Sequence, residues 1–219
     1  MTMLAEATSP EVSKGSLVVV PVGSVEQHGP HLPLDTDTVI AQAVAAAIAE
    51  RLGGWCAPAV AYGSSGEHQD FPGTTSIGTP ILGRVVVELV RSLRYWAGSV
   101  ILVNGHGGNV DALNAAVGLL MDQGHDVRWV PCARSGMDAH AGRAETSLML
   151  HLRPASVRLH LAEPGNCAPI SSLVPHLRAH GVAAVSRNGV LGDPRGATAE
   201  EGERLLTDMI DALAATRTS

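Results

Sequence analysis

Two side chains in a short polar segment are spaced so that both could bind metal ions. Glu26 and His28 lie in GSVEQHGPHLPLDTD, and residues two apart in an extended segment face the same way. A carboxylate and an imidazole placed like this can reach two adjacent ions, and Asp37, just before a predicted helix, is well placed to bridge them. The alternative is that His28 is an ordinary histidine with its hydrogen bonds satisfied, and that Asp37 caps the helix, because Asp is a preferred cap.

A second polar segment, VNGHGGN, joins the clearest predicted strand to a helix and has His106 at its centre. Its glycines let the backbone turn tightly and approach a ligand closely. The segment lacks the Gly-Lys-Ser/Thr ending of a phosphate-binding loop and the spacing of a dinucleotide fingerprint. A central histidine suits a nitrogen ligand to a metal better, and a glycine turn with an uninvolved His106 is the alternative.

Two further polar segments combine acids with histidines. In DAHAGRAETS, His140 lies in a loop and Glu145 lies at the start of a helix, where an acid can simply complement the helix dipole. That explanation accounts for Glu145 but not for the Asp-x-His before it. In YGSSGEHQDFPGTT, His68 either contacts a substrate or hydrogen-bonds within its own loop. Five other histidines are expected at the surface, namely His125, His151, His160, His176 and His180.

Short apolar runs alternate with longer Ala- and Leu-rich segments, which predicts strands alternating with helices. We expect strands at 16–22, 57–61, 99–103 and 127–131, and helices at 38–52, 80–96, 110–123, 146–152, 172–180 and 198–216. Thr198 and Glu201 match a capping box for the last helix. This order is typical of an α/β fold, a three-layer αβα domain with a mostly parallel central sheet. Because ligands bind beyond the carboxyl ends of such strands, the polar segments are candidates for one site.

The composition limits the possible classes of protein. The 219 residues fit one domain, 1–219, in which residues 1–14 are expected to form a flexible N-terminal arm. The net charge is −6, Lys14 is the only lysine and the arginines are scattered, so nucleic-acid binding is not expected. No apolar run reaches the roughly 20 residues that span a bilayer, and no secretory signal is readable, so we expect a cytoplasmic protein without a membrane partner. Three widely spaced cysteines argue against a disulfide framework or a cysteine-type zinc site.

The four polar segments together resemble the creatininase family of metal-dependent amidohydrolases. The matching blocks are GSVEQHGPHLPLDTD, GEHQDFPGT, VNGHGGN and DAHAGRAETS, in the family's order. The resemblance implies a centre with two divalent ions, in which Glu26 and His106 hold one ion, His28 holds the other and Asp37 bridges them. A set of two histidines and three carboxylates suits Zn, Mn or Fe(II).

The resemblance also implies roles in the third block. Creatininase has an acidic ligand two residues after the loop histidine, where this chain has Gly108, and Glu145 is the expected replacement. His140 matches the family's catalytic histidine. The usual HAGExETS pattern has Glu where this chain has Arg143, so contacts to the substrate are expected to differ there.

These residues suggest hydrolysis of an amide bond. Two divalent ions that share a water lower its pKa from about 15.7 towards 7, and His140 would protonate the leaving amine. The C-terminal text GVAAVSRNGVLGDPRGATAEEG is most like family members that act on a ribosomally made precursor peptide. The resemblance therefore implies that a modified precursor peptide is the substrate, that a modified C-terminal Val-Tyr dipeptide is released, and that the protein is a homo-oligomer. The alternatives are a small-molecule amidohydrolase acting on a cyclic amide or a formamide, and a non-catalytic metal-binding or scaffold subunit.

Overall fold

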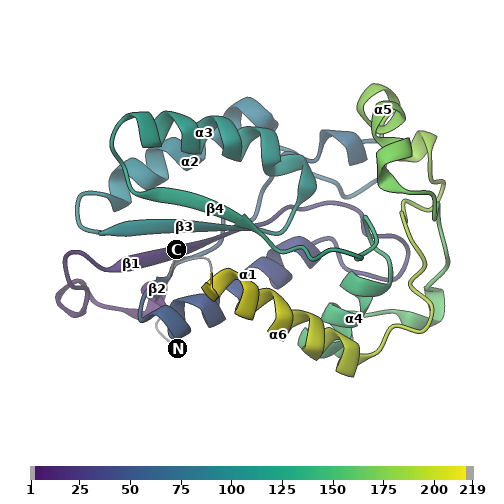
Figure 1. Cartoon of the computed structure of the whole chain (residues 1–219). Coiled ribbons are helices and arrows are strands. Elements are labelled where there is room, and N and C mark those ends of the chain that lie inside the picture. The colour runs from purple at the N-terminus through teal and green to yellow at the C-terminus, as the bar shows by residue number, and fades with distance from the viewer. Residues whose placement is uncertain (1–2, 216–219) are drawn as a thin grey trace.

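The computed structural model describes residues 3–215, which are built around one four-stranded parallel sheet in the order β2-β1-β3-β4. The strands are β1 (Leu17–Val22), β2 (Trp55–Cys56), β3 (Ser99–Asn104) and β4 (Val127–Pro131). The helices are α1 (Thr36–Leu52), α2 (Thr79–Leu93), α3 (Val110–Asp122), α4 (Arg143–Leu152), α5 (Ile170–His180) and α6 (Ala199–Ala215). Helices α2 and α3 cover one face of the sheet, α1, α4 and α6 cover the other, and α5 lies beyond the end of the sheet (Figure 1). The predicted three-layer α/β arrangement with a parallel sheet is confirmed.

The central strand β1 explains why the sequence has a continuous apolar run instead of an alternating pattern. All six of its residues are buried, because helices pack on both faces of the sheet. On one face of the sheet, the side chains of Val18, Val20 and Val22 pack against α2 and α3. On the other face, Leu17 and Val19 pack against α1. The sheet is therefore held from both sides.

The second strand is shorter and earlier than predicted. The sequence suggested a strand at 57–61, but β2 contains only Trp55–Cys56, and Val60 forms a single isolated bridge with Val22. Pro58 lies between these two contacts. The Ala57 N–H donates to the Val19 carbonyl and the Val60 N–H to the Pro21 carbonyl, so this segment advances three residues against two of β1, and the regular ladder is interrupted.

The largest difference between an expected and an observed helix start is at α4, and the capping box expected for α6 forms only in part. Helix α4 begins at Arg143 and not at residue 146, because the carboxylate of Asp138 accepts hydrogen bonds from the backbone N–H groups of Arg143 and Ala144. Before α6, only half of the expected capping box forms. The Glu201 N–H donates to Thr198 Oγ1 at 3.1 Å, but the Glu201 carboxylate binds Arg143 instead of returning to the Thr198 N–H. The predicted end of this helix, Thr216, lies outside the described residues.

The described part of the N-terminal arm contains two short 3₁₀ turns, Leu4–Glu6 and Ser9–Glu11. Met3 forms an isolated parallel bridge with Cys56 at the edge strand β2, and Leu4 packs against the core. Five further 3₁₀ turns lie at Gly66–His68, Gly107–Asn109, Pro154–Ser156, Leu159–Leu161 and Val182–Ala184.

Candidate metal centre

The carboxyl ends of β1 and β3 bring the first two polar segments to one edge of the sheet. Val22 and Asn104 pair at this edge, and the loops that follow them carry Glu26 and His106. The second loop passes very close to the start of α1, since a Cβ at Gly105 would lie only 2.4 Å from the backbone oxygen of Asp37. Only glycine allows this approach, which places His106 beside the Asp37 side chain.

Asp37 lies between two imidazoles. Its Oδ1 is 3.0 Å from His28 Nε2 and its Oδ2 is 3.3 Å from His106 Nδ1, and all three side chains are buried. Ser24 Oγ donates a further hydrogen bond to Oδ2 at 2.7 Å. Asp37 belongs to the first turn of α1, whose N-cap residue is Asp35, so the helix-cap alternative for Asp37 does not hold.

Glu26 is the second buried carboxylate of the cluster, and it is surrounded by imidazole nitrogens. Its Oε2 is 3.0 Å from His106 Nε2, and its Oε1 is 3.6 Å from His68 Nε2 and 3.7 Å from His140 Nδ1. The side chain is 0% exposed, and neither oxygen accepts a hydrogen bond. A buried carboxylate in this state is costly unless a cation balances it. The donor set therefore fits a metal ion.

The remaining predicted ligand, Glu145, lies at the border of the cluster. Its Oε2 is 3.8 Å from His28 Nε2 and accepts a hydrogen bond from the Ala141 N–H at 2.6 Å. Three groups of nitrogen and oxygen atoms lie within 4.8 Å of one another and could each hold an ion: Glu26, His28 and Asp37; His28, His140 and Glu145; and Glu26, His68 and His140. The predicted residues thus converge on one small volume.

Two imidazoles of the cluster favour the protonated form at atoms where cations would bind. Burial acts to lower the pKa of His28, but the charge and hydrogen bond of Asp37 outweigh it and raise that pKa to about 10. Burial likewise opposes protonation of His106, yet Glu26 and Asp37 raise its pKa well above the usual value. Burial acts to raise the pKa of Asp37, and the charges of His28 and His106 nevertheless hold it well below its usual value. Metal ions compete with such protons for the same atoms.

Two other histidines of the cluster stay neutral. Burial lowers the pKa of His140 well below its usual value, and the charge of His28 lowers it further. Burial also lowers the pKa of His68, to about 4. The His140 ring lies between the other two, with its centroid 4.3 Å from that of His28 and 4.4 Å from that of His68. The centre therefore offers neutral imidazoles beside its ligand atoms.

Two residues of the cluster were missed from the sequence. Glu67 Oε1 lies 3.5 Å from His106 Nε2, and burial raises the pKa of this carboxyl. Its oxygen occupies the space that a side chain at Gly108 would need, because a Cβ there would lie 2.4 Å away. The glycine at 108 was the only signal in the sequence. Gln27, between two expected ligands, contacts His68 and His140 through its amide, and nothing in its local pattern indicated this.

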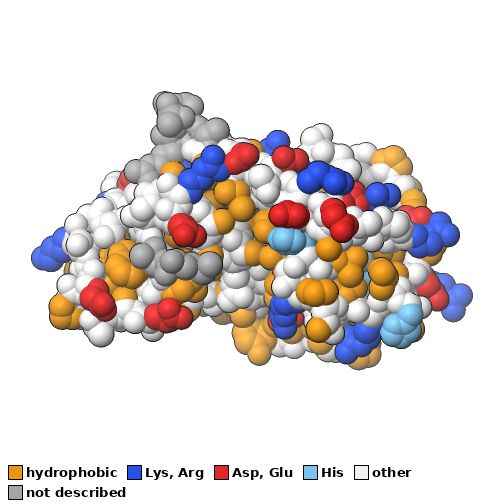
Figure 2. Space-filling view, turned by 90° about the horizontal axis from the view of Figure 1, so that it is seen from below, with side chains coloured by type: hydrophobic (Ala, Val, Ile, Leu, Met, Phe, Trp, Pro, Cys, Tyr) orange, Lys and Arg blue, Asp and Glu red, His pale blue; other side chains and the backbone are white. Residues whose placement is uncertain are grey.

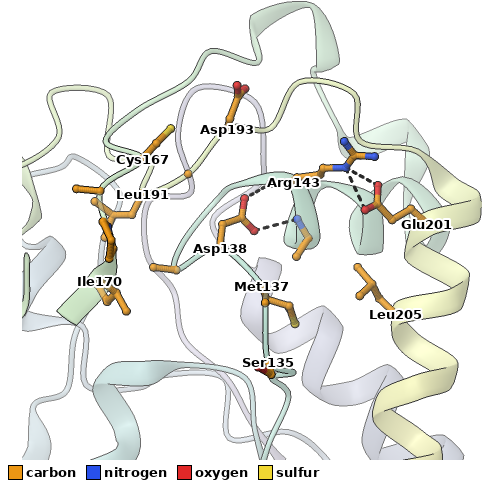
Figure 3. A pocket seen from close by; sticks show the side chains of 16 residues that line it. Ser135, Met137, Asp138, Arg143, Cys167, Ile170, Leu191, Asp193, Glu201 and Leu205 are labelled. Atoms are coloured by element: carbon orange, nitrogen blue, oxygen red, sulfur yellow. Dashed lines mark hydrogen bonds and ion pairs between the residues drawn. The ribbon is translucent and has the colours of Figure 1, made fainter. Parts of the chain in front are cut away.

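Arg143, the unusual residue in the third block, lies away from the ligand atoms. It lines a neighbouring cavity of about 540 Å³ together with Asp138, Cys167 and Leu205. Figure 3 shows its side chain directed to Glu201 of α6, where Arg143 Nε lies 2.7 Å from a carboxylate oxygen. The replacement of Glu by Arg at this position is therefore accommodated by pairing with α6.

The surface carries charges of both signs. Figure 2 shows one face of the molecule on which acidic and basic side chains are interspersed and do not gather into one patch. Within residues 3–215, no helix is both long and apolar enough to cross a membrane. Of the five histidines expected at the surface, His160, His176 and His180 are exposed, and His125 and His151 are half-buried.

Comparison with known proteins supports the resemblance on which the site was predicted. The family model of creatininase, described as creatinine amidohydrolase, matches residues 5–216. The chain is 54% identical over 204 residues to the mycofactocin precursor peptide peptidase of Mycolicibacterium smegmatis, covering 90% of this chain and 83% of that protein. It is 31% identical to the creatinine amidohydrolase of Pseudomonas putida, covering 90% and 87% of the two chains. A solved structure of a creatininase mutant described as Zn-Zn type superposes with a TM-score of 0.78 at 27% identity, covering 98% and 96% of the two chains. The chain belongs to the creatininase family of amidohydrolases.

Proposed function

We propose that this chain is a metal-dependent peptidase that cleaves the mycofactocin precursor peptide and releases a modified C-terminal Val-Tyr dipeptide. The substrate is inferred from the Mycolicibacterium smegmatis relative, which is similar over nearly the whole chain. The chemistry is inferred from the buried Glu26 carboxylate, whose two oxygens face three imidazoles and accept no hydrogen bond. That observation carries the proposal, because a metal ion bound to these oxygens would balance the buried charge.

Two divalent ions, Zn, Fe(II) or Mn, would be held by five side chains. Glu26 and His106 would hold one ion, His28 the other, and Asp37 would bridge them, which suits its position between the two imidazoles. Glu145 would complete the set from the side of His28. When bound, the ions would acidify a water molecule and polarise the scissile carbonyl.

His140 would move the proton during the reaction. Its Nδ1 faces the Glu26 carboxylate at 3.7 Å, and the ring is neutral because burial lowers its pKa. A neutral imidazole can take a proton from the attacking water and return it to the leaving amine. His68, whose Nε2 faces the same oxygen at 3.6 Å, would contact the substrate.

The assay is incubation of the metal-loaded protein with modified precursor peptide, followed by mass spectrometry of the products. We expect release of a dipeptide and a precursor shortened by the same mass, and no release after treatment with a chelator. The matched control is the His140→Ala variant, loaded with the same metal. An intact peptide in the presence of fully metal-loaded wild-type protein would contradict the proposal.

A second candidate is a small-molecule amidohydrolase acting on a cyclic amide or a formamide. It is favoured by the similarity to the creatinine amidohydrolase of Pseudomonas putida. Creatinine and a formamidopyrimidine are therefore included as substrates in the same assay. Turnover of either one without cleavage of the peptide would replace the first proposal by the second.

The assembly and location are further parts of the proposal. We expect a homo-oligomer in the cytoplasm, without nucleic-acid or membrane partners. Apolar side chains are exposed on α2 and α3, namely Ile81, Leu119 and Met121, and the two helices border a cavity of about 570 Å³. This apolar surface supports association between copies of the chain. Light scattering on the purified protein is expected to give a multiple of 22.6 kDa, and a mass of 22.6 kDa would contradict it.

A further inference from the structure

The side chains of His68 and His140 face one point of the centre through two different ring nitrogens. His68 Nε2 and His140 Nδ1 lie 3.6 and 3.7 Å from the same oxygen, Glu26 Oε1. Each neutral imidazole has one N–H donor and one unprotonated nitrogen. What the two rings can do at this point therefore depends on which nitrogen of each ring carries the proton.

The orientation of the Gln27 amide is fixed at both of its ends. The Gly29 N–H donates to Gln27 Oε1 at 2.9 Å, and a backbone N–H can only face an acceptor. At the other end, Gln27 Nε2 donates to the carbonyl oxygen of Gly189 at 3.0 Å. If the amide were flipped, its NH₂ group would face the Gly29 N–H and its oxygen would face the Gly189 carbonyl oxygen, and neither contact could be a hydrogen bond. The backbone is held as well, because the Gln27 N–H donates to Thr74 Oγ1 at 3.1 Å.

The backbone of Gln27 determines the tautomer of His140. His140 Nε2 lies 2.8 Å from the carbonyl oxygen of Gln27, which can only accept, so this nitrogen carries the proton. The 3.0 Å contact between His140 Nε2 and Gln27 Nε2 then joins two donors and is not a hydrogen bond. His140 consequently presents an unprotonated Nδ1 to Glu26.

The side chain of Gln27 determines the tautomer of His68. Of the two amide protons, one goes to Gly189, and the other points to His68 Nδ1 at 2.9 Å. His68 Nδ1 is thus the acceptor, and the proton of the neutral ring lies on Nε2, the nitrogen that faces Glu26. A metal ligand would need that nitrogen unprotonated, so His68 does not act as one, although its distances would allow it.

We propose that Gln27 is a positioning residue that makes His68 a hydrogen-bond donor, and leaves His140 a proton acceptor, towards the same point of the centre. This role rests on the proposed amide hydrolysis. The His68 Nε2–H donates a hydrogen bond to the carbonyl oxygen of the substrate, on which negative charge develops during the reaction. His140 Nδ1 takes the proton of the attacking water. One residue thus sets opposite roles for two adjacent imidazoles, one through its side chain and the other through its backbone.

The first test measures the tautomers without any substrate. In protein labelled with ¹⁵N at histidine, two-bond ¹H–¹⁵N correlations report which ring nitrogen is protonated, and His68→Ala and His140→Ala spectra assign the signals. We expect both rings to be protonated at Nε2 in the metal-free and the zinc-loaded protein. Gln27→Glu replaces the amide donor by a carboxylate acceptor, so His68 is expected to change to the Nδ1–H form while His140 does not change.

The matched control is Gln69→Glu, because Gln69 is exposed and lies next to His68 in the chain. It adds the same charge without removing the donor, and both tautomers are expected to stay as in the wild type. A His68 ring protonated at Nδ1 in the wild type, or unaffected by Gln27→Glu, would overturn the proposal. This result is independent of the substrate, so it is distinguishable from a failure of the proposed peptidase activity.

The second test separates a donor from a metal ligand at His68. His68→Leu removes the donor and is expected to lower kcat by about 10² to 10³, the usual effect of losing one such donor, with little change in KM. His68→Gln retains an N–H at the corresponding position and is expected to recover most of that loss. Both variants should bind as much zinc as the wild type by elemental analysis. Loss of zinc in His68→Leu, or equal activity of the two variants, would contradict the donor role.

Discussion

Asp37 Oδ1 lies 3.0 Å from His28 Nε2, and both side chains are buried at the carboxyl edge of the sheet. The other oxygen of Asp37 faces the imidazole of His106, so this carboxylate lies between the two histidines that are proposed to hold different ions. Asp37→Asn should therefore abolish binding of both ions and reduce activity to background. Asp35→Asn is the control, since its surface pair with Arg153 is worth at most about 1 kcal/mol. Elemental analysis that finds full metal content in Asp37→Asn would refute the bridging role.

Replacing His106 and replacing His140 are expected to have different effects on metal content and activity. His106→Ala removes a proposed ligand, so metal content and activity should fall together. His140→Ala should keep its metal and lose activity by about 10² to 10⁴, the usual contribution of general acid–base catalysis. Metal content is measured by elemental analysis and activity by dipeptide release, with the exposed His160→Ala as control. Retained activity in either site variant means that the role assigned to that residue is wrong.

Stability of the metal-free protein should pass through a maximum near pH 6.5. The pKa of His28 rises from 6.5 to about 10 on folding, so its contribution is fully present below pH 6.5 and is lost as the pH rises towards 10. The pKa of His68 falls to about 4, so its contribution is present above pH 6.5 and is lost as the pH falls towards 4. Thermal unfolding in the presence of a chelator measures the curve. His28→Gln should flatten the alkaline side, and an unchanged alkaline side would contradict the raised pKa of His28.

Metal affinity should fall as the solution becomes more acidic, because each ion has to displace protons from His28 and His106. Isothermal titration in buffers with different ionisation enthalpies counts the protons released when zinc binds. We expect proton release at pH 7.5 that is reduced in His28→Gln. Zinc binding without any release of protons would show that these imidazoles are not protonated in the metal-free protein.

The close contact between two loops gives a further prediction. Gly105→Ala should weaken metal binding and destabilise the fold, because its Cβ would lie 2.4 Å from the backbone oxygen of Asp37. Gly118→Ala is the matched control: it lies exposed within α3 and has nothing within 4 Å, so it should stabilise by about 0.5–1 kcal/mol. Chemical unfolding and zinc titration compare the two variants. Equal effects of both would mean that the approach of the loops is not required.

The sequence predicted those parts of the structure that depend on local pattern. The buried strands β1 and β3 follow from continuous apolar runs, whereas β4 is a half-buried strand that includes Arg128. The ligand candidates follow from four separated blocks that resemble one family. The strand near Ala57 was misplaced, because an extra residue between Ala57 and Val60 shifts the register against β1 and interrupts the ladder that composition favoured. The start of α4 was missed because Asp138, outside the periodic segment, caps it.

The roles of Gln27 and Glu67 could not be predicted for a different reason. Gln27 depends on the carbonyl group of Gly189, 162 residues further along the chain, and on imidazoles from two other loops. Glu67 occupies space left free by the missing side chain of Gly108. Contacts of this kind arise from the tertiary structure, and the hydrophobic periodicity of the sequence does not predict them.

The protons held on His28 and His106 have a consequence for how the enzyme acquires its metal. Because they already offset the buried carboxylates, the polypeptide can reach its native shape before any cation arrives. We therefore expect metal binding to follow folding, and we expect the identity of the bound ion to depend on which cation is supplied. Purification from media enriched in zinc, manganese or iron should accordingly yield one fold with different metals.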